Sequence, residues 1–266
     1  MKKSILLRKQ HCRLLNMVWF PLAFMVQPAL AASHSTHHSP ASTSSPSSYV
    51  FALSAGPLVA RAGETQTINT QIDIRRTYAA NREAQTVGTG ELFFGLQRDL
   101  NEFWQGQLGL ALAKAGTVAV DGTIWEDGDP RFDNFLDSYQ LRHSSASLKG
   151  KLIANLGGFL KPYVSGSAGV ALNQTSGFQN SVAPEIADLT DPVPNFQDKD
   201  VFAFTYTVGA GLEYTVTPKI AVGLGYEFSD WGQSKLCRTP VQSVNDGPSI
   251  NHTYTNAMLL SVTFLI

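Results

Sequence analysis

Residues 201–229 alternate between apolar and small or polar side chains along two stretches separated by a turn at residues 216–219. The apolar positions are Phe202, Phe204, Tyr206, Val208, Ala210, Leu212 and Tyr214, then Ile220, Val222, Leu224, Tyr226 and Phe228. The positions between them hold mostly Gly, Ala, Ser and Thr, with Glu213 in the first stretch and Glu227 in the second. A period of two over this length predicts two antiparallel β-strands with unlike faces.

The face with small side chains indicates the kind of sheet that these strands form. A soluble sandwich packs large apolar residues into its core, whereas a transmembrane β-barrel points them at lipid and encloses small and polar residues. Strands of about ten residues are long enough to cross a bilayer when they are tilted. On this stretch alone, a soluble lipocalin-like barrel or a sandwich hairpin is the alternative.

The rest of the chain repeats the pattern six times. The further alternating stretches are residues 49–58, 87–97, 103–113, 139–153, 160–173 and 254–266. The long connections are residues 61–85, 116–137, 174–200 and 230–251, and the short ones are residues 98–102, 155–158 and 216–219. An even strand number with long connections on one side only is typical of outer-membrane barrels. The sequence therefore predicts an all-β fold, an eight-stranded antiparallel up-and-down transmembrane β-barrel with four long external loops and short periplasmic turns.

The first 47 residues differ from the rest in composition. A basic start, an apolar core over residues 14–26 and the run Ala29-Leu30-Ala31 predict a signal peptide over residues 1–31, with an uncleaved anchor helix as the alternative. Residues 32–47 are rich in Ser, Pro and His and are expected to be a disordered leader, so the barrel covers residues 48–266. Five of the 20 basic residues leave with the signal, so 15 remain against 21 acidic ones. This balance excludes an electrostatic case for nucleic-acid binding.

Two runs in the last third carry a resemblance to a known family. Val-Gly-Ala-Gly-Leu-Glu-Tyr at residues 208–214 and Gly-Leu-Gly-Tyr-Glu-Phe-Ser-Asp-Trp-Gly at residues 223–232 resemble the outer-membrane β-barrel family of opacity-type surface antigens. The resemblance implies an outer-membrane location, contact with outer-membrane lipid and lipopolysaccharide, and insertion by the barrel assembly machinery. The final strand resembles the family's assembly signal, but it ends on Ile266 where an aromatic residue is commonest, and Phe264 lies two positions earlier.

Three features of the sequence are candidate sites of chemistry. His143 and Ser145 resemble the dyad of outer-membrane lipid A deacylases, but they share the strand face expected to point into the lumen, away from lipid. The long loop 116–137 holds six carboxylates whose spacing matches no EF-hand loop, so a solvated acidic loop is favoured over a Ca²⁺ site. Its acidic residues are Asp121, Glu126, Asp127, Asp129, Asp133 and Asp137. Cys237, the one cysteine after the signal, is expected to be an unpaired surface thiol, with an intermolecular disulfide as the alternative.

These patterns predict a non-catalytic surface protein, monomeric, with no catalytic, cofactor or metal residues, that binds a host-surface ligand through its loops. A small pore and a deacylase using His143 and Ser145 are the alternatives. An eight-stranded lumen is only wide enough for side chains. A second expectation concerns this lumen, where Lys149 and Lys151 should meet Glu91 and Glu213 in an ionic cluster. Glu227 is expected to contact loop residues or water instead.

Overall fold

The computed structural model describes residues 47–71, 74–184, 187–188, 191–240, 242 and 246–266. The expectations for the signal peptide and for residues 32–46 of the leader therefore lie outside the described residues. Within these ranges no helix is long and apolar enough to cross a membrane.

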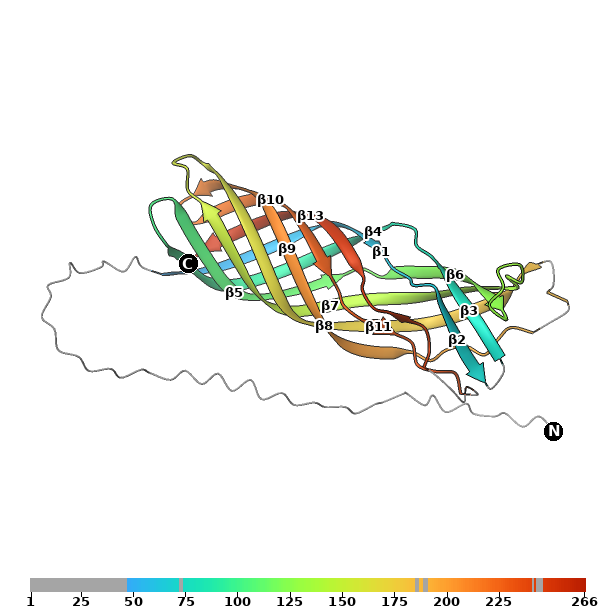
Figure 1. Ribbon diagram of the computed structural model, residues 1–266. Helices are drawn as coiled ribbons and strands as arrows, with labels where there is room; N and C mark the ends of the chain where they lie inside the picture. The colour runs from blue at the N-terminus through green and yellow to red at the C-terminus, as the bar shows by residue number, and fades with distance from the viewer. Residues whose placement is uncertain (1–46, 72–73, 185–186, 189–190, 241, 243–245) are drawn as a thin grey trace, which may run out of the picture.

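Eight strands form a closed antiparallel ring (Figure 1). In ring order they are β1 (Ser48–Arg61), β4 (Gln85–Asp99), β5 (Trp104–Ala115), β7 (Phe135–Ala154), β8 (Leu160–Val182), β9 (Lys199–Thr217), β10 (Ile220–Asp230) and β13 (Tyr254–Leu265). The ring closes where β1 pairs with β13, with Val50 opposite Leu265 and Arg61 opposite Tyr254. A closed ladder leaves no unpaired strand edge, which is the condition for crossing a bilayer with strands. The predicted eight-stranded barrel is confirmed.

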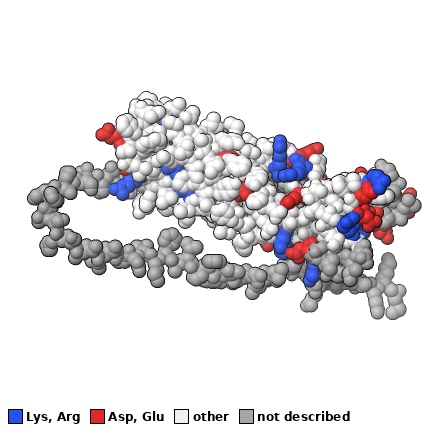
Figure 2. All heavy atoms as spheres, viewed as in Figure 1, with Lys and Arg blue, Asp and Glu red and all other residues white. Residues whose placement is uncertain are grey.

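The predicted face of each strand is confirmed as well. Large apolar side chains point outward over a broad band that is almost free of charge on the face shown in Figure 2. Outward examples from six strands are Phe94, Leu110, Leu148, Phe204, Leu212, Leu224 and Leu260. Apart from Glu227, the inward positions of β10 are small because the lumen is narrow. A Cβ atom added to Gly225, for example, would overlap the hydroxyl group of Tyr163 on β8.

The first two long connections are folded, which corrects the expectation of simple loops at residues 61–85 and 116–137. They contain β2 (Gln66–Gln71), β3 (Ile74–Asn81) and β6 (Val118–Glu126), each antiparallel to its neighbour. β6 then pairs with the outer part of β7, from Phe135 to Leu141, so the sheet continues beyond the ring. β7 and β8 are correspondingly longer than predicted. Figure 1 shows this extension projecting from one end of the barrel, with the C-terminus at the other end.

The extension has an apolar core that continues into the neighbouring end of the ring, where it includes inward residues of β1, β5 and β13. Residues of β2, β3, β6, β7 and β8 pack there with residues of the third and fourth connections. The fourth connection contains β11 (Ser234–Lys235) and β12 (Ser249–Ile250), which pair with each other. The largest members of the core are Ile68, Tyr78, Ile124, Phe135, Tyr139, Leu141, Phe178, Phe196, Trp231, Leu236 and Ile250. We call the part of the chain beyond the ring, which comprises β2, β3, β6, the outer parts of β7 and β8 and the third and fourth connections, the cap. Burial of this apolar surface stabilises the cap as a folded unit.

Arginine in place of Leu224 tests the assignment of the outward face. Leu224 is 50% exposed in the middle of β10, so the variant places a charge in the hydrocarbon and should lower the free energy of unfolding by about 2–4 kcal/mol. The measurement is urea unfolding in lipid bilayers, with Thr217→Arg in the periplasmic turn as the control that should change it by about 0–1 kcal/mol. An unchanged free energy for Leu224→Arg would contradict the assignment.

Candidate functional site

A network of buried ion pairs crosses the lumen. The Nζ atom of Lys149 lies 2.5 Å from Oε1 of Glu91 and 2.7 Å from Oε1 of Glu227, so one lysine on β7 joins β4 to β10. The Nζ atom of Lys151 lies 2.8 Å from Oε1 of Glu213 on β9. Their side chains are between 5% and 13% exposed. We call these five residues the lumen cluster.

The lumen cluster confirms the predicted ionic plug and corrects one of its members. Glu227 was expected to meet loop residues or water, but it binds Lys149 instead. The ammonium group of Lys151 also lies 4.5 Å from the centre of the Tyr163 ring, in a cation–π contact. Each lysine therefore has a carboxylate partner in a region where an unpaired charge is costly.

The remaining space in the lumen is small. A cavity of about 40 Å³ lies between the lumen cluster and Trp231, and one of about 20 Å³ lies beside Lys149, Lys151 and Tyr163. These volumes hold a few water molecules at most. Toward the periplasmic end, Phe93 packs with Val50, Ala52 and Ala111 in an apolar group. Side chains therefore fill the lumen from the lumen cluster to the periplasmic end.

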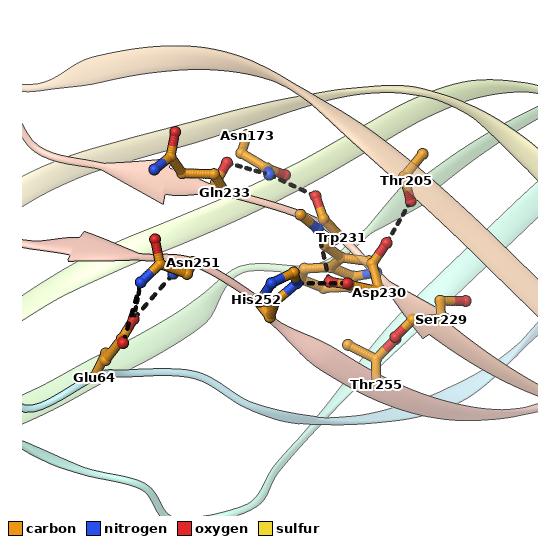
Figure 3. A network of polar contacts seen from close by, with 11 residues as sticks. Glu64, Asn173, Thr205, Ser229, Asp230, Trp231, Gln233, Asn251, His252 and Thr255 are labelled. Atoms are coloured by element: carbon orange, nitrogen blue, oxygen red, sulfur yellow. Dashed lines mark hydrogen bonds and ion pairs between the residues drawn. The ribbon is translucent and has the colours of Figure 1, made fainter.

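The mouth below the cap is covered by a second polar network (Figure 3). The Nδ2 atom of Asn173 donates to the carbonyl oxygens of Trp231 at 2.8 Å and Gln233 at 2.9 Å, which fixes the chain just after β10. The Oδ1 atom of Asn173 lies 2.8 Å from Nδ1 of His143. Because an amide oxygen only accepts, the Nδ1 atom of His143 carries the hydrogen. The His143 ring stacks on Trp231, with ring centres 4.3 Å apart.

His143 and Ser145 face the lumen, as their position in the strand predicted. His143 is buried, and its Nδ1 donates a hydrogen bond to Oδ1 of Asn173. Ser145 lines the 40 Å³ cavity. No hydrogen bond joins the two side chains in the described part of the chain. A dyad that cleaves lipid would have to face the bilayer, so this arrangement suits a structural role for His143.

Sequence reasoning missed an aspartate–histidine pair at the end of β10. Oδ2 of buried Asp230 lies 2.7 Å from Nδ1 of His252, and its Oδ1 accepts from the backbone N–H of Gly232 at 2.9 Å. The pairing of Asp230 with Tyr254 could have indicated it, because β10 and β13 are neighbours in the predicted barrel. Next to this pair, Asn251 donates from its backbone and from Nδ2 to Glu64, at 3.0 and 3.1 Å. Figure 3 shows both contacts tying the fourth connection to the barrel and to the first connection.

The six carboxylates of residues 116–137 differ in their surroundings. Among the described residues, no three His, Cys, Asp or Glu side chains lie close enough together to hold an ion. Asp129 is partly exposed and accepts hydrogen bonds from Arg131, which lower its pKa. Asp137 is different, because it belongs to the cap portion of β7, outside the membrane, and is 8% exposed. Burial, and secondarily the negative charge of Asp121, raise the pKa of Asp137 to about 7.

Cys237 corrects the expectation of an unpaired surface thiol. The residue is buried in the cap, 4% exposed, and no cysteine among the described residues is free. Its backbone exchanges hydrogen bonds with Gln197, at 2.8 and 3.1 Å, and so holds the fourth connection against the third.

Comparisons with known proteins show the fold alone. No protein-family model matches the chain, and no curated protein sequence matches it. The solved structures with a similar fold include Neisserial surface protein A (13% identity, 82% of this chain and 98% of that one, TM-score 0.40). They also include the outer membrane protease OmpT from Escherichia coli (9% identity, 82% of this chain and 97% of that one, TM-score 0.44). A third is Ail, the attachment invasion locus protein of Yersinia pestis (12% identity, 83% of this chain and 98% of that one, TM-score 0.34). The closed ring and its lipid-facing band place the chain in the bacterial outer membrane, as an eight-stranded β-barrel protein.

Proposed function

We propose that the protein is a non-catalytic surface protein of the opacity type, which binds a ligand on the host surface through its cap. The observation that carries the proposal is the contrast between the two halves of the molecule. The lumen is filled by the lumen cluster, whereas the cap is a folded sheet that lies outside the ring and encloses buried apolar side chains. A rigid, solvent-facing sheet is a suitable scaffold for recognition, since it presents loops in fixed positions.

The two alternatives receive less support from the same contacts. A pore needs a continuous aqueous path, and the two cavities that the described residues line in the lumen are small. A deacylase using His143 and Ser145 needs a lipid-facing dyad, and these residues face inward.

A binding experiment tests the proposal. Purified protein in lipid nanodiscs is passed over immobilised collagen, laminin, fibronectin and heparin, together with a variant in which residues 66–81 are replaced by a short Gly/Ser linker. Wild-type protein should bind at least one of these materials saturably, and the variant should lose this binding because β2 and β3 are absent. Val262→Ala on the lipid face is the matched control and should bind as wild type does. Failure of the wild type to bind any of the four, or equal binding by the linker variant, would contradict the proposal.

A further inference from the structure

Two basic side chains lie together on the outer surface of the barrel, at the upper edge of its lipid-facing band. Lys114 is at the end of β5 and Arg142 lies in β7, and both are exposed. Lys114 is opposite Ser144 in the β5–β7 ladder, and Arg142 is two positions from Ser144 on the same face. Diagonal neighbours of this kind are about 7–8 Å apart at the backbone, within reach of long side chains.

The outward positions below this pair are uncharged. On β5 they are Trp104, Gly106, Leu108, Leu110 and Leu112, and on β7 they are Ser144, Ala146, Leu148, Gly150 and Leu152. Leu110, Leu112 and Leu148 are each more than half exposed, as lipid contact requires. Lys114 and Arg142 are therefore the first charges above the hydrocarbon, at the level where the headgroups of the outer leaflet lie.

Neither cation has a carboxylate partner among the described residues. The ion pairs of this part of the chain involve other side chains. Arg142 is oriented by one hydrogen bond, in which its Nε donates to Oγ1 of Thr117 at 3.3 Å, and its terminal nitrogens donate to no described residue. Two neighbouring positive charges repel one another unless an anion lies between them. A guanidinium group offers paired donors to phosphate, and an ammonium group adds a second point charge.

We infer that Lys114 and Arg142 bind the phosphate group of an outer-leaflet lipid whose acyl chains lie along Leu112 and Leu148. The site takes a lipid rather than a soluble anion because the basic pair continues directly into the apolar surface below it. It is separate from the surface of the cap that the proposed function uses. The lipid would hold the β5–β7 side of the barrel at a fixed depth and orientation below the cap.

Native mass spectrometry tests the site. Wild-type protein, the double variant Lys114→Gln/Arg142→Gln and a control double variant Arg98→Gln/Lys219→Gln are placed in phosphatidylcholine nanodiscs that contain bisphosphorylated lipid A. The control removes the same charge at the periplasmic end. Wild type and control should retain lipid A after release from the nanodisc. The fraction of protein that retains lipid A should be at least about tenfold lower for Lys114→Gln/Arg142→Gln, because two contacts to phosphate are lost.

Three results would overturn the inference. The first is equal retention of lipid A by all three proteins. The second is equal retention by the wild type of lipid A from which the phosphates have been removed. The third is displacement of the retained lipid A by inorganic phosphate at a concentration equal to that of the lipid, which would assign the pair to a soluble anion. Heat-modified mobility on gels confirms that each variant is folded, so that loss of binding is not loss of the barrel.

Discussion

Replacing Lys149 by methionine should lower the free energy of unfolding by about 3–5 kcal/mol, the largest effect expected of any single substitution in the barrel. The ammonium group of Lys149 is the partner of both Glu91 and Glu227, and its side chain is 8% exposed. Its removal leaves two carboxylates near one another in a poorly hydrated lumen. The measurement is equilibrium unfolding in urea with the protein in bilayers at neutral pH.

The control for this substitution removes the carboxylates as well. In the triple variant Lys149→Met/Glu91→Gln/Glu227→Gln no charge is left unpaired, so its loss of stability should be smaller than that of Lys149→Met alone. Lys219→Met, in the periplasmic turn, should have almost no effect. If the losses of the single substitutions simply add in the triple variant, the three side chains do not form a coupled network.

The stability of the cap should decrease as the pH rises from about 4 to about 7, because of Asp137. Its carboxyl is buried, its Oδ1 accepts no hydrogen bond from a described residue, and its pKa is raised from 3.8 to about 7. Between these two pKa values the folded state holds a proton that the unfolded state has lost. The contribution of Asp137 to stability is therefore complete below about pH 3.8, decreases between pH 3.8 and 7, and is lost above about pH 7. A shift of about three pKa units corresponds to an upper limit of about 4 kcal/mol.

The groups around Asp137 come from four parts of the cap. They are Asp121 on β6, Tyr78 on β3, Tyr139 on β7 and Glu64 after β1. Asp137→Asn should remove the pH dependence and be more stable than wild type at pH 8, whereas the two proteins should be about equal at pH 4. The stability of the cap at each pH is measured by following its unfolding through the fluorescence of Trp125 on β6. Asp121→Asn is the control and should lower the pKa of Asp137 only in part. A wild-type stability that does not change between pH 4 and pH 8 would contradict this account.

The barrel could be predicted from the sequence because its pattern is local and periodic. In β10, for example, each lipid-facing residue is followed by one that faces the lumen, so the period of two assigns both Leu224 and Gly223 without knowledge of the neighbouring strands. The same rule placed Lys149, Lys151, Glu91 and Glu213 inside. It also placed Glu227 inside but did not predict that Glu227 binds Lys149, because the depth at which two inward residues meet depends on the tilt and stagger of the strands, which alternation does not encode.

The cap could not be predicted for a different reason. Its strands are short, and β6 pairs with β7 only because β7 continues beyond the ring. The outer part of β7 does alternate, with Phe135, Asp137, Tyr139 and Leu141 on its buried face. Because Asp137 is acidic, the start of this strand was assigned to the end of the acidic loop. The Asp230–His252 pair was missed because it joins the end of β10 to the fourth connection, whose conformation no local pattern determines.

The central claim is that the lumen is closed and that the protein acts from its cap. Conductance in planar lipid bilayers tests the closed lumen most directly, with purified wild-type protein inserted at a known density and neutral salt on both sides. The lumen cluster and the apolar group around Phe93 predict no steady conductance above that of the bare bilayer. A stable open channel, present in most insertions of the unmodified protein, would contradict the account.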